Sequence, residues 1–169
     1  MIKRCAWILL VIAILGGHVA QAASPGGAAN WTVQRGLDRL TGRDRCLLQS
    51  KVETIHDGHD DVPIQLALTA DAMLVVTESN IDLTYPGIGL RVDQLDPIPI
   101  DRLFKKTMVV FDRDIATIVE EFIKGYRATV SLGFWPTWPK GQTQSATFSL
   151  LGFTQAYHAF RACEDDTPL

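Results

Sequence analysis

Long basic runs and catalytic signature motifs are both missing from this chain. Without clustered lysine and arginine, and with a formal net charge of −3 at pH 7, it has no electrostatic footprint for nucleic acid or for an anionic membrane. It contains no Gly-x-Ser-x-Gly elbow, no glycine-rich phosphate loop and no His-Glu-x-x-His pair. We therefore predict a non-enzymatic protein with no catalytic residue, no cofactor and no nucleic-acid partner.

Long apolar runs are also scarce, and the main one lies at the N-terminus. Lys3 and Arg4 precede an apolar run at 6–15, and a small-x-small site follows at 20–22, which is the pattern of a secretory signal peptide. The run is shorter than the roughly 20 residues that span a bilayer, so an uncleaved anchor is the lesser alternative. Cleavage after Ala22 would leave 14 basic and 19 acidic side chains, a formal charge of −5. We expect the mature protein to be soluble, without a membrane span, and periplasmic or secreted.

Cysteine is rare, with three in the chain. Cys5 falls in the predicted signal peptide, so the mature chain would keep Cys46 and Cys163. In an oxidising compartment an even pair usually bonds, and two cysteines allow one connectivity. We predict a Cys46–Cys163 disulfide between an early strand and the last helix. Two separate buried thiols are the alternative, and the distant spacing argues against a metal site.

The hydrophobic pattern changes period along the chain. Alternating or continuous apolar residues predict strands at 31–33, 46–55, 62–70, 73–77, 88–92, 106–111, 126–134 and 145–150. A helical period predicts one helix over 115–123, capped by Asp112 or Asp114 and ended by Gly125. It predicts a second helix that is capped by Thr154 and contains Cys163. The glycine-rich, charged segment 34–45 is predicted to be a loop.

These elements predict a mainly β fold with two short helices in the C-terminal half. The strands turn every eight to twelve residues, which is typical of an antiparallel sandwich or a partly open barrel. We place a single β-rich domain at 31–165, after a flexible tail at 23–30 that is rich in small residues.

Metal-ligand side chains gather at one point in the chain, which contains His56, Asp57, His59, Asp60 and Asp61. Imidazole and carboxylate groups are ligands for divalent metals. The cluster falls in a predicted hairpin turn, however, and no third histidine is near. We interpret it as a solvated polar turn and assign no metal ligands, with a weak exposed metal site as the alternative.

Three other polar residues were considered as catalytic groups. His158 has no nucleophile placed near it by the sequence, so a structural role is the better interpretation. Asp93 and Asp96 stand in a proline-rich segment, where aspartate commonly forms turns.

Two tryptophans, Trp135 and Trp138, alternate with prolines in the segment "WPTWPKGQ" at 135–142. Tryptophans on a stiff exposed loop offer a large contact area at low entropic cost. These two residues are therefore candidates for partner binding. The alternative, which the sequence favours, is that one or both pack back onto the core.

The C-terminal stretches "FIKGYRATVSLGF" and "QSATFSLLGFTQAYHAFRAC" resemble the bacterial exported family called invasion-associated locus B. The match includes the Lys124-Gly125 step and the Ser-Leu-Leu-Gly-Phe segment at 149–153, and more faintly Trp31 and the Cys46 strand. The chain departs from the family's pattern at Arg35 and at 111–113, where members commonly have cysteine. The resemblance implies an exported β-rich protein, linked in some bacteria to host-cell interaction, without catalytic residues.

Three functions follow from these observations, in order of preference. The first is an exported module that binds a protein or an envelope component. The second is an inhibitor or immunity-type protein of an exported hydrolase. The third is a metal-dependent hydrolase that uses His56, His59 or His158.

Overall fold

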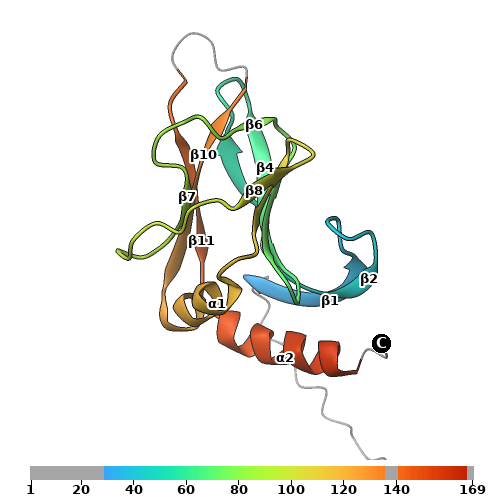
Figure 1. The fold of residues 1–169 in the computed structure, drawn as a ribbon. Helices are drawn as coiled ribbons and strands as arrows, with labels where there is room; N and C mark the ends of the chain where they lie inside the picture. The colour runs from blue at the N-terminus through green and yellow to red at the C-terminus, as the bar shows by residue number, and fades with distance from the viewer. Residues whose placement is uncertain (1–28, 136–140, 167–169) are drawn as a thin grey trace, which may run out of the picture.

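The computed structural model describes residues 29–135 and 141–166, which form two β-sheets and two helices (Figure 1). The strands are β1 (Trp31–Leu37), β2 (Asp44–Ser50), β3 (Glu53–His56), β4 (Asp61–Leu68), β5 (Met73–Thr77), β6 (Ile81–Asp82), β7 (Gly89–Val92), β8 (Arg102–Phe104), β9 (Met108–Phe111), β10 (Arg127–Phe134) and β11 (Gln144–Ser149). The helices are α1 (Ile115–Lys124) and α2 (Phe153–Asp165).

The strands are arranged as the two sheets of an antiparallel sandwich. The larger sheet has the order β1-β2-β4-β5-β9-β8, with β3 paired to the free half of β4. The smaller sheet has the order β11-β10-β6, and β7 also pairs with β10. Both helices lie at one end of the sandwich, opposite the end that holds β6 (Figure 1). This confirms the predicted fold class in its sandwich form, with the helices in the C-terminal half.

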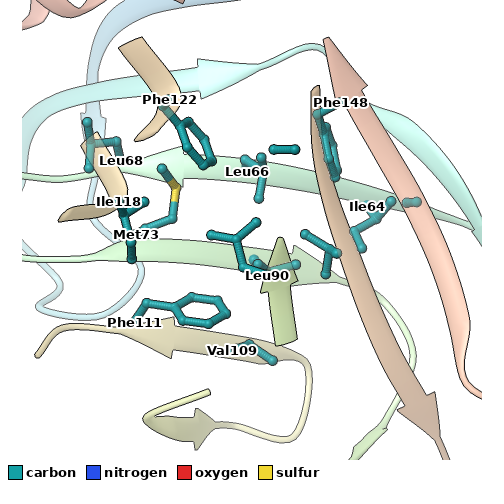
Figure 2. Packing of buried hydrophobic residues seen from close by; sticks show 14 of the residues in the cluster. Ile64, Leu66, Leu68, Met73, Leu90, Val109, Phe111, Ile118, Phe122 and Phe148 are labelled. Atoms are coloured by element: carbon teal, nitrogen blue, oxygen red, sulfur yellow. The ribbon is translucent and has the colours of Figure 1, made fainter. Parts of the chain in front are cut away.

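The core lies between the sheets, because each sheet turns one face of period-two side chains inward. In β4, Ile64, Leu66 and Leu68 are buried, and in β10 the alternate residues from Ala128 to Phe134 are buried. Figure 2 shows these β4 side chains facing Leu90 and Phe148 of the smaller sheet and Phe122 of α1. Burial of an aliphatic or aromatic side chain contributes about 1.5–3 kcal/mol, so this layer supplies the main driving force for folding.

A short glycine step brings α1 back to the smaller sheet. Ile118 and Phe122, one stripe of α1, are buried against the core. Gly125 ends the helix in an extended conformation, with φ −86° and ψ 170°. A Cβ at this position would collide with Val92 and come within 2.9 Å of the Glu121 carbonyl oxygen. Glycine is therefore needed here for close approach and not for a left-handed turn.

Several predicted strand boundaries were wrong, because strand pairing overrides local composition. The predicted loop 34–45 contains the second half of β1, which pairs with β2 from Trp31↔Ser50 to Leu37↔Asp44. The predicted strand 46–55 is two strands, β2 and β3, separated by residues 51–52. The break is fixed by Ser50, whose hydroxyl accepts the Leu66 N–H and donates to the Lys51 carbonyl.

The predicted helix caps were also wrong in detail. Asp114 occupies the N-cap of α1 but makes no side-chain cap bond, and the Asp112 carboxylate pairs with Arg102. The carboxylate of Asp101 accepts the N–H groups of Asp112 and Arg113 just before the helix. In α2 the N-cap is Gly152, with φ 88°, so Thr154 lies inside the helix. Neither replacement could be identified from the local sequence, because Asp101 lies just before β8, at a distance along the chain, and Gly152 is a left-handed glycine.

Candidate functional site

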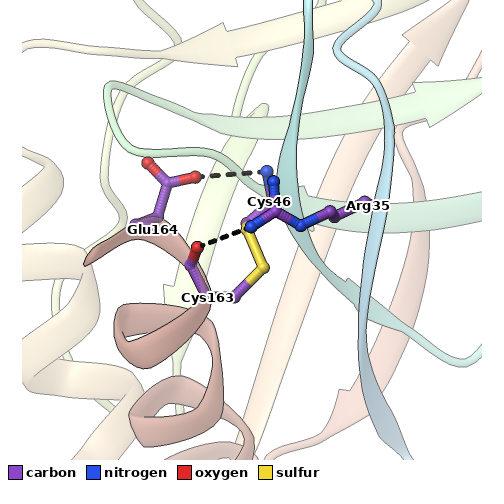
Figure 3. The surroundings of a disulfide bond; sticks show 4 residues. All are labelled: Arg35, Cys46, Cys163 and Glu164. Atoms are coloured by element: carbon purple, nitrogen blue, oxygen red, sulfur yellow. Dashed lines mark hydrogen bonds between the residues drawn. A yellow bond between two sulfur atoms is a disulfide. The ribbon is translucent and has the colours of Figure 1, made fainter. Parts of the chain in front are cut away.

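The disulfide that the sequence predicted joins β2 to α2 (Figure 3). Cys46 and Cys163 have Cα atoms 6.0 Å apart and are 117 residues apart in the sequence. Two hydrogen bonds surround the bridge: the Cys46 N–H donates to Glu164 Oε1 at 3.2 Å, and Arg35 donates to the Cys163 carbonyl at 3.4 Å. The bridge thus fixes α2 over β1 and β2 and has a structural role.

Aromatic side chains close the same end of the sandwich. Trp31 is 4% exposed and its indole N–H donates to the Ser149 carbonyl at 2.8 Å. Its ring meets Phe122 and Phe153 edge to face, with centroids 6.0 Å and 4.9 Å apart. Both the apolar surface and the polar atom of this tryptophan are satisfied within the fold. Trp31 is therefore a packing residue and offers nothing to a partner.

Trp135 differs from Trp31 in its exposure to solvent. It follows β10, whose last residues pair with β6 as Gly133↔Asp82 and Phe134↔Ile81, and its N–H donates to the Asn80 carbonyl at 2.8 Å. Alternation along β10 turns Phe134 into the core and Trp135 outward, where it is 64% exposed. The packing alternative for Trp135 was therefore wrong. Trp138 lies outside the described residues.

A hollow of about 490 Å³, which we call the Trp135 cavity, lies beside this indole. Its apolar lining consists of Ile81, Leu83, Leu103 and Trp135. Leu83 is itself 39% exposed. Residues of β6 and β8 and Trp135, which follows β10, thus converge on one open apolar site. The elements that carry them meet at the end of the sandwich opposite the helices (Figure 1). Binding sites commonly combine such a lining with a few polar groups.

Three polar residues, Asn80, Asp82 and Lys106, complete the lining of the Trp135 cavity. The carboxylate of Asp82 is already occupied, because Oδ1 accepts the Thr84 N–H at 2.9 Å and the Thr84 hydroxyl at 2.7 Å. These hydrogen bonds lower the pKa of Asp82. Lys106 is exposed, and the structure shows no ion pair to it from the described residues.

The histidine and aspartate cluster forms the turn between β3 and β4. Asp57 Oδ1 accepts the N–H groups of His59 and Asp60, each at 2.9 Å, and its other oxygen accepts the Ser79 hydroxyl. The hydrogen bonds from Asp60 and Ser79 lower the pKa of Asp57 to about 2. His56 Nδ1 lies 3.3 Å from Asp61 Oδ1. Over 29–135 and 141–166, no three histidine, cysteine or acidic side chains are placed to hold a metal ion.

The remaining sequence candidates are not brought together. His158 is exposed on α2. Asp93 has a positive φ of 47°, and its carboxylate accepts the N–H groups of Tyr126 and Arg127 at 2.9 and 3.0 Å. Asp93 therefore joins the end of β7 to the start of β10, which is a structural task. Asp96 is exposed in the following segment.

The sequence did not single out Glu121 as a site residue, because the helical period places it on the polar side of α1. Its Oε2 is buried without a hydrogen-bond partner in the part of the chain that the structure describes. Burial, and secondarily the charge of Glu120, raise the pKa of Glu121. It borders a hollow of about 600 Å³ between α1 and the segment after β7. Glu120 in the same lining is paired with Lys124 at 2.5 Å, so the hollow lacks a free cation to orient an anionic ligand.

Both described helices fall short of the length and apolarity that crossing a bilayer demands. Searches against family models and against curated proteins gave no match. Among solved structures, the chain is similar to the crystal structure of invasion associated protein B from Bartonella henselae, with a TM-score of 0.55 and 17% identity. The alignment covers 81% of this chain and 95% of the other. At that identity the likeness shows the fold alone, and it is the fold that the sequence resemblance implied.

Proposed function

We propose that this protein is an exported, non-enzymatic binding module whose partner inserts an apolar side chain into the Trp135 cavity. The single observation that carries the proposal is the 64% exposed indole beside an open apolar hollow. Tryptophan, with tyrosine and arginine, is enriched among the residues that contribute most to binding, which commonly lie in pockets at the centre of an interface. The occupant is a segment of a protein or of another envelope component that presents a leucine-sized or aromatic group.

Export is supported by two independent features. The N-terminal pattern of charge, apolar run and small-x-small site is that of a signal peptide, and disulfides form and persist mainly outside the reducing cytosol. The fold shared with invasion associated protein B agrees with an exported protein. A role in host interaction would follow only if the partner were a host molecule.

A non-enzymatic role is supported by how the chemically active groups are used. The carboxylates of Asp57, Asp82 and Asp93 accept hydrogen bonds from their own turns, so they hold the backbone. Among the described residues, no histidine lines the Trp135 cavity. The site therefore offers area and shape to a partner, without a proton-transfer pair.

The test compares two variants of the Trp135 cavity with a variant at a distant surface residue. Trp135→Ala and Leu83→Ser should each weaken capture of peptides from a random dodecapeptide library by about tenfold or more, equivalent to roughly 1.4 kcal/mol. Leu151→Ala, at a residue 78% exposed beside α2, should bind as the parent chain does. Equal capture by the parent chain and the three variants would contradict the proposal. Catalytic turnover of a substrate that Trp135→Ala retains would contradict it as well.

A further inference from the structure

The turn between β8 and β9 has an unusual backbone for its sequence. Phe104 pairs with Met108, and the turn between them contains Lys105 and Lys106 with φ of 49° and 63°. The left-handed region disfavours residues with a Cβ, and glycine or asparagine is the usual occupant. Lysine nevertheless occupies both positions, so the backbone of this turn is strained. Such strain at consecutive residues points to a functional site.

Tertiary hydrogen bonds hold the strained backbone in place. The Lys106 carbonyl accepts the Ile81 N–H at 2.7 Å, and the Thr107 carbonyl accepts the Thr77 N–H at 3.0 Å. The turn is thus fixed against the segment between β5 and β6. The same segment supplies Asn80 and Ile81 to the Trp135 cavity, so the turn and the cavity are held in one rigid arrangement.

The two lysines stand beside two different apolar hollows. Lys106 lines the Trp135 cavity. Lys105 lines a second hollow of about 340 Å³, which we call the Phe104 hollow, whose apolar lining includes Phe104, Met108 and Val76. The ammonium of Lys105 lies 5.2 Å from the centre of the Phe104 ring. The turn therefore forms a cationic ridge between two apolar depressions.

The charges around this ridge are unbalanced. Lys105, Lys106 and Arg39, which also borders the Phe104 hollow, are exposed, and none of them pairs with an acidic side chain among residues 29–135 and 141–166. The carboxylates that line the hollows are internally occupied. Asp82 accepts hydrogen bonds from Thr84, and buried Asp38 accepts them from Leu40 and Thr41 beside Arg45. The ridge therefore offers the charges of Lys105 and Lys106, which form no ion pair among the described residues, to a negatively charged partner.

We propose that the partner is an acidic peptide segment that crosses the Lys105–Lys106 ridge and places one apolar side chain in the Trp135 cavity. Its aspartate or glutamate side chains pair with Lys105 and Lys106. Charge complementarity selects the segment and speeds its association, and the apolar group holds it. This inference rests on the proposed function, since it names the partner of the same cavity.

The experiment is selection of random dodecapeptides displayed on phage, using the exported chain with its disulfide intact. We expect the bound peptides to be enriched in aspartate and glutamate next to leucine, phenylalanine or tryptophan. A synthetic peptide of a selected sequence should bind Lys105→Asn/Lys106→Asn about tenfold more weakly than the parent chain, and the difference should shrink at high salt. The control Lys51→Asn, at another exposed lysine, should bind like the parent.

A stability measurement separates this role from a structural one. Asparagine tolerates the left-handed backbone, so Lys105→Asn/Lys106→Asn should melt at the same temperature as the parent chain or higher while it loses binding. The acidic partner would be ruled out if the selected peptides were apolar without acidic enrichment, or if they bound the double variant as tightly as the parent chain. Either result would still be consistent with apolar binding in the Trp135 cavity. If Trp135→Ala selected the same peptides as the parent chain, the proposed function itself would be overturned.

Discussion

The two ends of the sandwich use the same kind of side chain in opposite ways. At the helix-covered end, formed by β1, α1 and α2, Trp31 is 4% exposed, bonds through its indole N–H and meets two phenylalanine rings. At the opposite end, Trp135 is 64% exposed beside an open hollow. Burial of apolar area drives folding, so the first end supplies stability. The second end leaves that area available to another molecule.

The largest expected effect comes from opening the helix-covered end by removing its covalent bond. Cys46→Ala/Cys163→Ala should lower the free energy of unfolding by about 4–5 kcal/mol, because a loop of roughly 100 residues is no longer closed in the unfolded chain. Urea denaturation followed by circular dichroism measures the change. The parent chain unfolded under reducing conditions should match the double variant, and a loss below about 1 kcal/mol would show that the bridge adds little.

The next effect comes from the aromatic cluster at the start of α2. Phe153→Ala should cost about 3–5 kcal/mol, because a fully buried ring leaves a cavity between Trp31, Phe122 and Tyr157. Leu151→Ala, two residues earlier and 78% exposed, is the matched control and should change stability by less than about 0.5 kcal/mol. Similar losses in both variants would remove the contrast between buried and exposed positions.

A smaller effect is expected from acid at the Trp135 end, where Asp57 of the β3–β4 turn accepts the hydroxyl of Ser79. Its pKa, lowered from 3.8 to about 2 in the folded chain, means that the folded state favours the ionised form. The resulting stability is present above pH 3.8 and is lost as the pH falls toward 2. Allowing for solvent screening, the loss is about 1 kcal/mol. Asp57→Asn should be less stable at neutral pH and show a flatter decline over that range in urea titrations.

The smallest expected effect on folding is at Trp135 itself. Trp135→Ala should shift the free energy of unfolding by less than about 0.5 kcal/mol, because most of the ring already contacts water. Trp31→Ala, measured beside it, should lose about 3–5 kcal/mol. If thermal melts gave the two variants comparable losses, Trp135 would be a packing residue and the comparison between the ends would fail.

Much of the fold was predictable because burial imposes a period on the sequence. The alternation in 62–68 and 126–134, and the helical stripe through Ile118 and Phe122, identified the buried faces of β4, β10 and α1. The disulfide was predictable because the two cysteines that follow the expected signal peptide allow one pairing. The boundaries of β1 and the caps of both helices were not, since partners distant in sequence, such as Asp101 for the start of α1, decide them.

The sequence by itself determined the mainly β class, the one connectivity open to Cys46 and Cys163 and the candidacy of Trp135, because each depends on residue type and period along the chain. Tertiary structure decided the rest. It alone turned Trp31 inward and Trp135 outward, and it occupied the carboxylates of Asp57 and Asp93 in turns. It also set the Lys105–Lys106 turn beside a cavity lined by residues of β6 and β8 and by Trp135. The physical reason is that exposure, charge balance and backbone strain depend on neighbours that chain order does not reveal.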